Sequence, residues 1–398
     1  MPERAIANPI LSGATVGDAV ARVLEVIRRH VGMDVACISE FVGDRVVCRK
    51  IDAPGLDALI KVGDSHALED VYGRHILTGA LPEFIPDTSA HAMASTMPIT
   101  RAIPIGSHIG IPIRLADGTC YGMLCCLSFE PDHSLDDRDH GMVSAFTELA
   151  AFEIGRDVEA RRQEREKLSR IEAVLVDGLF QIVYQPIWDI HARQTVGFEA
   201  LCRVQAEPLR PPDLWFAEAD EVQRREAFEL RAIQKATSAL SALPDETFLA
   251  LNASPSTILR PDLLAALRGL RPERIVLEIT EQILIADYEA IRAALAPLRA
   301  LGVRIALDDL GAGYCSLRHI LQLEPDMIKL DITLIRDIDA DPVRQAMIGA
   351  LVGFTERTGC SIIAEGVETE AELECLLTLN VGFAQGYHLG RPAPLEGA

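Results

Sequence analysis

The sequence predicts an α/β protein: a C-terminal (β/α)8 TIM-like barrel with one antiparallel strand, preceded by a small α+β domain and a long joining helix. Three observations support this prediction. Beyond Gly178, eight short β-rich segments alternate with longer helical ones. Before residue 155, a helical segment is followed by strand candidates and a hairpin turn. Between them, residues 142–175 contain no proline and one glycine, which is typical of continuous helix.

The first domain is expected at residues 14–155. Residues 16–33 carry apolar side chains at helical spacing, including Val20, Val23 and Ile27. Strand candidates follow at 35–42, 44–51, 108–115 and 121–129. The last two flank the turn sequence Ala116-Asp117-Gly118, so these two strands are expected to form a hairpin.

A helical linker is expected at residues 156–174. Residues 156–170, RDVEARRQEREKLSR, are almost entirely charged or polar. Two interpretations are open: a solvated helix with i,i+4 ion pairs, which the charge pattern favours, or a signalling helix that pairs with its twin in a dimer.

The barrel is expected at residues 175–398. Its strand candidates are 182–188, 195–201, 247–252, 274–280, 303–309, 326–331, 361–366 and 382–387. Only the short polar segment 189–194 separates the first two, which is too short for a helical crossover. These two strands are therefore expected to pair antiparallel, and the others to run parallel.

Composition excludes several classes of partner. The 398 residues carry 38 Lys and Arg against 59 Asp and Glu, a formal net charge of −21, which disfavours DNA and anionic lipid as partners. No apolar run approaches the roughly 18 residues of a membrane span, and the first residues do not resemble a secretory signal. We therefore expect a cytoplasmic protein without membrane contact, with its nine cysteines reduced.

Polar side chains stand where the barrel strands are expected to end, at the rim where barrel enzymes place their active sites. They are Glu199, Asn252, Glu278, Asp308, Asp309, Lys329, Asp331, Glu365 and Gln385. So many acidic groups at one mouth would repel one another unless cations neutralised them. Oxygen ligands without His or Cys favour Mg²⁺ or Mn²⁺, and adjacent Asp308 and Asp309 fit a two-metal site. With Lys329 near the attacking water, the residues predict a metal-dependent phosphodiesterase.

The same residues lie in motifs that resemble the EAL-domain phosphodiesterases, which hydrolyse the bacterial second messenger cyclic di-GMP. The resemblance covers about residues 175 to 393. Its motifs are Gln185-Pro186-Ile187, Glu199-Ala200-Leu201 with Arg203, Asn252-Ala253-Ser254, Glu278-Ile279-Thr280-Glu281, DDLGAGYCSL (308–317), IKLD (328–331), AEGVET (364–369) and QGYHLGRP (385–392).

The resemblance implies a role for each matching position. Glu199, Asn252, Glu278 and Asp308 would bind one divalent cation, and Asp308, Asp309 and Glu365 a second, the cations being Mg²⁺ or Mn²⁺. Lys329 would orient or deprotonate the attacking water, and Gln385 would line the same pocket. Gln185 and Arg203 would contact substrate, and Glu281 would tether the loop after the fifth strand.

The implied activity is hydrolysis of cyclic di-GMP to linear pGpG by a homodimer. Two alternatives stay open: a receptor that binds the dinucleotide without cleaving it and signals through the linker helix, and a scaffold that only oligomerises. The chain departs from the family's usual DDFGTGYSSL at Leu310, Ala312 and Cys315, which puts regulation in question more than chemistry.

The first domain resembles GAF sensor domains, through the domain order, its terminal helix and the segment IGIPIRLADGTCYGMLCCLSF (109–129). The stretch 67–108 would then cover a pocket for a small ligand that the sequence does not identify. Its candidate contacts are Tyr72, Arg74, His75, Pro82 and His91. The alternative is that these residues belong to a surface loop and bind no ligand. Cys125 and Cys126 are adjacent on one strand and point to opposite faces, so a disulfide between them is not expected.

Overall fold

The computed structural model describes residues 18–280, 287–311 and 316–395. The chain divides into two compact units, and the division falls between Arg165 and Glu166. Glu281, Ala312 and Cys315, which the sequence singled out, lie outside the described residues.

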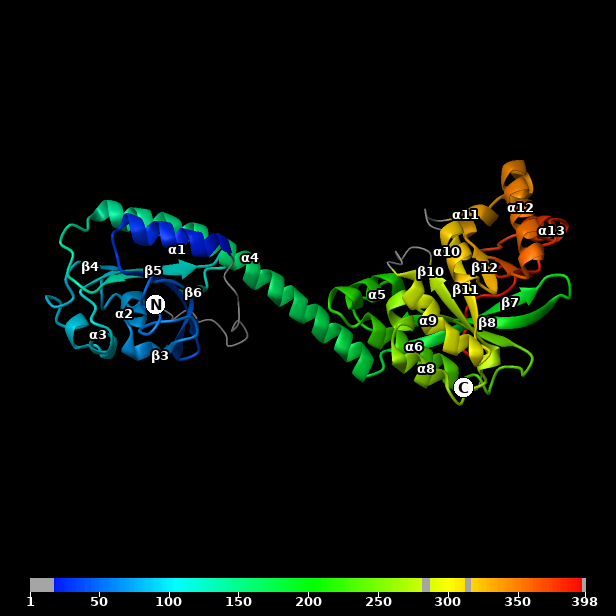
Figure 1. Ribbon diagram of the computed structural model, residues 1–398, viewed down its shortest axis with the longest axis horizontal. Helices are drawn as coiled ribbons and strands as arrows, with labels where there is room; N and C mark the ends of the chain where they lie inside the picture. The colour runs from blue at the N-terminus through cyan, green and yellow to red at the C-terminus, as the bar shows by residue number, and fades with distance from the viewer. Residues whose placement is uncertain (1–17, 281–286, 312–315, 396–398) are drawn as a thin grey trace. The chain divides into compact units, whose positions relative to one another are not determined.

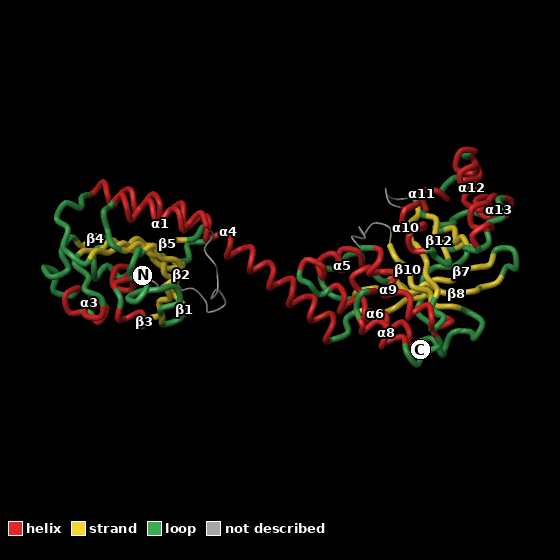
Figure 2. The backbone as a smooth tube through the Cα atoms, viewed as in Figure 1, coloured by secondary structure: helices red, strands yellow, loops and turns green. Residues whose placement is uncertain are grey.

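The N-terminal unit is one antiparallel sheet with helices on both faces (Figures 1 and 2). The strand order is β3-β2-β1-β6-β5-β4. The strands are β1 (Val35–Val42), β2 (Arg45–Asp52), β3 (Ser65–Ala67), β4 (Phe84–Ile85), β5 (Ser107–Arg114) and β6 (Cys120–Ser128). The helices are α1 (Asp18–His30), α2 (Tyr72–Leu77), α3 (Pro98–Ala102) and α4 (Asp137–Val176), with 3-10 turns η2 (Leu68–Asp70) and η3 (Ala94–Thr96).

Two apolar cores lie on opposite faces of this sheet, because successive strand residues point to opposite sides. Ile38 of β1 and Ile109 of β5 pack with α1 and α4 on one face. Phe41 of β1 packs with α2 on the other. The predicted hairpin is confirmed: β5 pairs with β6, and Asp117 accepts a hydrogen bond from the Thr119 amide in the turn between them.

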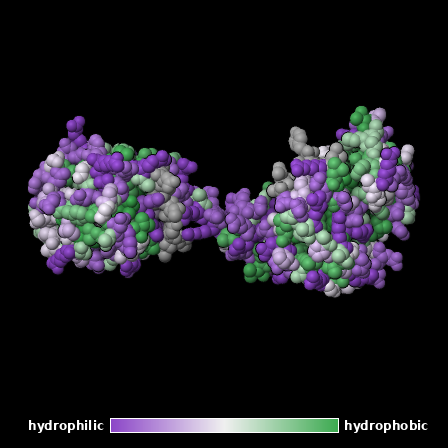
Figure 3. Space-filling model, viewed as in Figure 1, coloured by the Kyte–Doolittle hydropathy of each residue, from purple (hydrophilic) through white to green (hydrophobic). Residues whose placement is uncertain are grey.

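Helix α4 runs without interruption from Asp137 to Val176. Its first half buries Val143 and Ile154 in the core of the N-terminal unit, and its last turns bury Ile171 and Val174 against the barrel. The portion between them is hydrophilic at its surface (Figure 3). Within this portion, Glu159 forms an ion pair with Arg162 at i,i+3 spacing and accepts a hydrogen bond from the Gln163 amide at i,i+4 spacing.

The C-terminal unit is a closed barrel with the strand order β10-β11-β12-β13-β14-β7-β8-β9 (Figure 2). The strands are β7 (Phe180–Asp189), β8 (Gln194–Val204), β9 (Phe248–Asn252), β10 (Ile275–Thr280), β11 (Arg304–Leu310), β12 (Met327–Leu330), β13 (Ser361–Ala364) and β14 (Phe383–Ala384). The helices are α5 (Pro212–Glu221), α6 (Arg225–Ser238), α7 (Pro255–Ile258), α8 (Pro261–Leu267), α9 (Tyr288–Ala300), α10 (Ser316–Leu323), α11 (Ile332–Ile335), α12 (Pro342–Thr358) and α13 (Glu370–Thr378), with 3-10 turns η4 (Pro272–Arg274) and η5 (Ile338–Ala340).

The reversed strand of the barrel is β7. It pairs antiparallel with both β8 and β14, whereas the other neighbouring strands pair parallel. The prediction of one antiparallel strand is therefore confirmed. Among the described helices, none is both long and apolar enough to span a bilayer.

Candidate functional site

The centre of the site is Lys329, on β12 at the C-terminal rim of the barrel. Its side chain is 1% exposed. The ε-ammonium nitrogen lies 2.7 Å from Glu365, 3.0 Å from Glu278 and from Asp308, and 3.4 Å from Glu199. These four carboxylates come from four different strands or strand ends, so the closed barrel is what brings them to one point.

Glu199 is held by amide side chains as well as by Lys329. Gln385 donates a hydrogen bond of 2.6 Å to one carboxylate oxygen, and Asn252 donates one of 3.2 Å to the other. Gln385 also donates to Gln185, which in turn donates to the Gly390 carbonyl. The structure thus joins Gln185, Asn252 and Gln385 to the carboxylate cluster through Glu199.

The expectation that the second strand ends at Glu199 was wrong. Strand β8 continues to Val204 because its antiparallel pairing with β7 extends to the pair Phe180 and Val204. Its parallel pairing with β9 reaches only to Ala200 and Leu251. Glu199 therefore stands at the rim of the parallel barrel although it lies in the middle of its own strand.

Strand β11 carries a bulge at the two adjacent aspartates. Leu307 pairs with Ile328, and Leu310 pairs with Leu330, so Asp308 and Asp309 together lie opposite the single residue Lys329. Asp309 has a φ of 60°, in the left-handed region. Consecutive strand residues normally point to opposite faces, and a bulge changes that direction. One carboxylate oxygen each of Asp308, Asp309 and Glu365 therefore fit within 4.8 Å of one another.

The electrostatics of the cluster show an excess of negative charge. Burial opposes charge on Lys329, but the four surrounding carboxylates outweigh it and raise the pKa of the ammonium well above its ordinary value. Burial also raises the pKa of Glu278 well above its usual range, and neighbouring carboxylates add to that effect. Burial and the neighbouring Asp308 raise the pKa of Glu365 to about 8 and that of Asp309 to about 6.

Glu199 is the exception within the cluster. Burial favours its neutral form, but Lys329 and the hydrogen bonds from Gln385 and Asn252 outweigh burial and hold its pKa below the usual value.

The donor set fits divalent cations. It consists of carboxylate and amide oxygens, the ligands that Mg²⁺ and Mn²⁺ prefer. One oxygen of Glu278 is buried and has no hydrogen-bond partner among the described residues. A single ammonium cannot neutralise five carboxylates, and cations at the mouth would restore the charged form of those whose pKa is raised.

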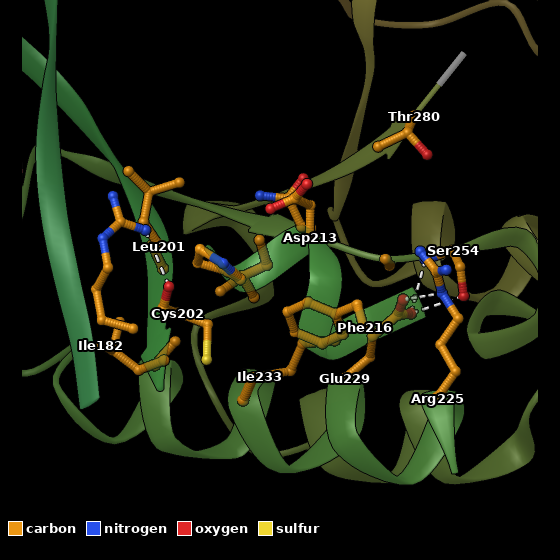
Figure 4. A pocket seen from close by; sticks show the side chains of 18 of the residues that line it. Ile182, Leu201, Cys202, Asp213, Phe216, Arg225, Glu229, Ile233, Ser254 and Thr280 are labelled. Atoms are coloured by element: carbon orange, nitrogen blue, oxygen red, sulfur yellow. Dashed lines mark hydrogen bonds and ion pairs between the residues drawn. The ribbon is translucent and has the colours of Figure 1, made fainter. Parts of the chain in front are cut away.

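A pocket of about 550 Å³ adjoins the cluster (Figure 4). Asn252 and Asp309 contribute to its wall on the side of the cluster, and Arg203 lines it as well. The volume lies within the range for small-molecule sites. The guanidinium of Arg203 has one described hydrogen bond, to the Cys202 carbonyl.

Sequence reasoning missed a buried carboxylate in the wall of this pocket. Glu229 on α6 is 6% exposed, accepts hydrogen bonds from the Ser254 amide and hydroxyl at 2.8 and 2.7 Å, and pairs with Arg225 at 2.8 Å (Figure 4). No local pattern distinguishes this glutamate from Glu226, the other acid of α6. Asp331, by contrast, was counted among the rim residues, but it caps α11 by accepting from the Thr333 amide.

Comparisons with known proteins identify the family of each unit. The EAL domain family matches residues 168–392. The chain belongs to the EAL domain family. Residues 16–154 match the GAF domain family, so both resemblances seen in the sequence are confirmed.

Among relatives of this EAL protein, the probable cyclic di-GMP phosphodiesterase PdeN of Escherichia coli is 32% identical over 231 residues, covering 54% of this chain and 44% of PdeN. A signaling protein of Caulobacter vibrioides is 30% identical over 304 residues, covering 74% of this chain and 36% of the relative. The EAL protein thus spans less than half the length of these two relatives.

Two solved structures show the same barrel. The PaMucR phosphodiesterase in complex with c-di-GMP is 28% identical with a TM-score of 0.53, covering 58% of this chain and 98% of that one. An EAL domain protein from Listeria monocytogenes is 25% identical with a TM-score of 0.51, covering 57% and 94%.

Of the five candidate ligand contacts in the GAF unit, only Tyr72 is among the residues that line the cavity on the α2 face of the sheet. Tyr72 is buried and lines a cavity. Arg74 and His75 are on α2, where Arg74 is exposed and faces Glu69 at 3.6 Å. Pro82 and His91 lie in connecting segments and do not line that cavity.

Proposed function

We propose that this EAL protein hydrolyses cyclic di-GMP to linear pGpG in a reaction that depends on divalent cations. One observation carries the proposal: five acidic side chains and Lys329 meet at the mouth of the barrel. Membership of the EAL family supports it, as does the similarity to PdeN, a probable cyclic di-GMP phosphodiesterase, and to the PaMucR phosphodiesterase, whose structure contains c-di-GMP.

We assign the metal ligands by position. Glu199, Asn252, Glu278 and Asp308 would hold one cation, and Asp308, Asp309 and Glu365 the other. When bound, a pair of Mg²⁺ or Mn²⁺ ions supplies Lewis-acid charge that stabilises the attacking and leaving oxygens of a phosphodiester. The bulge of β11 supports this assignment because it turns two consecutive carboxylates toward Glu365.

The other residues of the cluster position water and substrate. As an ammonium, Lys329 has three donors and no acceptor, so its role toward the attacking water is to donate a hydrogen bond and orient it. Gln385 and Gln185 hold Glu199 in place through the hydrogen bonds described above. Arg203 faces the adjoining pocket and is suited to a phosphate oxygen or a guanine edge. In-line attack on one phosphodiester then opens the ring to pGpG.

We further propose that the GAF unit regulates this reaction through α4 and that the EAL protein acts as a homodimer. The continuity of α4 supports the first point, since one helix carries core residues of both units. Light scattering at micromolar concentration tests the second, and a monomer would contradict it.

The experiment that tests the chemistry is incubation of the purified chain with cyclic di-GMP and Mg²⁺ or Mn²⁺, with the products separated by chromatography. We expect pGpG from the wild type and none from Glu199→Gln or Asp308→Asn. Asp262→Asn is the matched control, since this aspartate is 60% exposed on α8 and pairs only with Arg260 among the described residues.

The same assay separates the alternatives. Intact cyclic di-GMP that stays bound after long incubation with metal would identify a receptor, and the absence of both binding and turnover would identify a scaffold. Turnover that persists in both cluster variants would refute the assigned site.

A further inference from the structure

A buried carboxylate on α6 is fixed to the turn that follows β9. Glu229 is 6% exposed. Its Oε2 accepts hydrogen bonds from the Ser254 amide at 2.8 Å and from the Ser254 hydroxyl at 2.7 Å. Its Oε1 accepts a hydrogen bond from Arg225 Nε at 2.8 Å (Figure 4). Both oxygens are therefore engaged within the protein, so Glu229 acts neither as a general base nor as a cation ligand in this arrangement.

The turn that Glu229 holds begins at an assigned cation ligand, Asn252. This residue is the last of β9, and the pairing of β9 with β10 ends there. The next amide, that of Ala253, donates a hydrogen bond of 2.9 Å to the Glu278 carbonyl. Ser254 follows, and its amide and hydroxyl are held by Glu229. The backbone after Asn252 is thus tied to β10 on one side and to α6 on the other.

The side chain of Asn252 can bind a cation through only one of its two polar atoms. Its nitrogen donates a hydrogen bond of 3.2 Å to Glu199, which leaves the amide oxygen for the cation that the two residues would share. Residues that do not touch a metal commonly orient the side chains that do. The direction of this oxygen depends on the backbone at Asn252, and therefore on the turn that follows it.

A purely structural role does not need a charged group at this position. Ser254 caps α7 with its own hydroxyl, which accepts from the Thr257 amide at 3.4 Å. A neutral side chain on α6 would be enough to accept a hydrogen bond from the Ser254 amide. Burying a carboxylate costs free energy unless it is paired and hydrogen-bonded, and Arg225 of the same helix supplies the pair. This buried ion pair lies next to the turn of an assigned ligand.

We propose that Glu229 is a positioning residue, which fixes the turn after β9 through Ser254 and thereby directs the Asn252 oxygen to its cation. This inference rests on the proposed assignment of Asn252 as a ligand. Substitution of residues that orient metal ligands typically weakens metal binding or activity about 10- to 100-fold. Since Glu229 acts through the backbone rather than on the ligand itself, we expect the lower end of that range.

Mn²⁺ binding to the intact chain in the absence of cyclic di-GMP tests the proposal. Electron paramagnetic resonance measures free aqueous Mn²⁺ during the titration, so the readout does not depend on turnover. Glu229→Gln keeps the size of the side chain and removes its charge and one acceptor oxygen. We expect this variant to bind one of two Mn²⁺ ions about 10-fold more weakly and the other within about 2-fold of wild type. Glu226→Gln is the matched control, since this half-buried acid of α6 does not line the pocket.

A double mutant separates positioning from stability. In an Asn252→Ala background the ligand is already absent, so Glu229→Gln should weaken Mn²⁺ binding no further. An effect on stability alone would lower the urea midpoint in both backgrounds and leave Mn²⁺ affinity unchanged. The proposal is overturned if a folded Glu229→Gln binds Mn²⁺ as wild type does, or if the two substitutions weaken binding additively.

A second variant decides the matter if Glu229→Gln does not fold. Ser254→Ala removes one hydrogen bond to Glu229 and keeps the bond from the backbone amide. Weaker Mn²⁺ binding by this variant supports the proposal, and unchanged binding overturns it.

Failure of the proposed hydrolysis gives a different result. A wild type that binds two Mn²⁺ ions but leaves cyclic di-GMP intact refutes the hydrolysis, and the inference about Glu229 is still decided by Mn²⁺ binding. A wild type that forms pGpG while Glu229→Gln binds Mn²⁺ unchanged refutes the inference alone. A wild type that binds no Mn²⁺ overturns both the ligand assignment and the inference.

Discussion

Replacing Lys329 by Met tests whether this ammonium neutralises the carboxylate cluster. The side chain is almost fully buried, and its nitrogen lies within 3.4 Å of four carboxylates. Methionine has a similar volume, so little of the effect would come from a cavity. Removing one partner of a buried ion pair typically costs about 3 to 5 kcal/mol, because the remaining charge stays buried and unpaired. We expect a loss of that size in the free energy of unfolding of the barrel, measured without divalent cations.

Urea unfolding followed by tryptophan fluorescence measures this loss. Both tryptophans of the chain, Trp188 and Trp215, lie in the barrel unit, so the signal reports that unit alone. Lys167→Met is the matched control: this lysine pairs with Glu221 at the surface, and exposed pairs contribute at most about 1 kcal/mol.

The comparison has a clear refuting result. If Lys329→Met in EDTA unfolds at the same urea concentration as wild type, or loses no more stability than Lys167→Met, then Lys329 does not neutralise the cluster. A second measurement with Mg²⁺ or Mn²⁺ should reduce the difference between Lys329→Met and wild type, because cations would replace part of the lost positive charge.

Three further predictions concern pH, substrate and backbone geometry. Without metal, the pKa of Glu365 in the folded barrel is about 8, against an ordinary value of 4.5. The folded barrel therefore keeps a proton on Glu365 that the unfolded chain loses, and the contribution of Glu365 to the free energy of unfolding is complete below pH 4.5. That contribution falls by about 1.4 kcal/mol per pH unit as the pH rises toward 8; unfolding in EDTA whose urea midpoint does not fall over this range would contradict it. Arg203→Ala should lower kcat/KM about 10- to 100-fold, mainly through KM, as expected for a charged hydrogen bond to substrate; steady-state kinetics with an unchanged KM would argue against a substrate contact. Gly311→Ala should cost about 1 to 3 kcal/mol, because φ there is 116° and a Cβ would lie 2.7 Å from Leu334. Gly349→Ala in α12, where a Cβ meets nothing within 4 Å, is the control variant. Equal urea midpoints for Gly311→Ala and Gly349→Ala would refute the expected strain at Gly311.

Much of the fold could be predicted because its signals are local. The barrel strands are short β-rich runs between helical segments, and the length of the segment 189–194 was enough to predict the antiparallel pairing of β7 with β8. The short elements β3, β4, α2 and α3 were not predicted. Each has only two to six residues, too few for a hydrophobic period to show, and tertiary packing on the sheet stabilises them.

The residue types of the candidate site were also evident from the sequence, because acids and amides recur at expected strand ends. Their arrangement was not. Asp308 and Asp309 are neighbours, and an ordinary strand would point them to opposite faces; the bulge opposite Lys329 turns both toward Glu365. The end of β8 could not be predicted locally, because its antiparallel pairing with β7 extends it beyond Glu199 to Val204.

By itself, the sequence determined the order of the elements, the barrel class and the oxygen-rich chemistry of its rim, since these follow from local composition and period. Only the tertiary structure decided which groups share an environment. It surrounds Lys329 with four carboxylates and buries Glu229 in the wall of the adjoining pocket. Burial and charge interaction depend on distances between residues far apart in the chain, and those distances are set only once the barrel has closed.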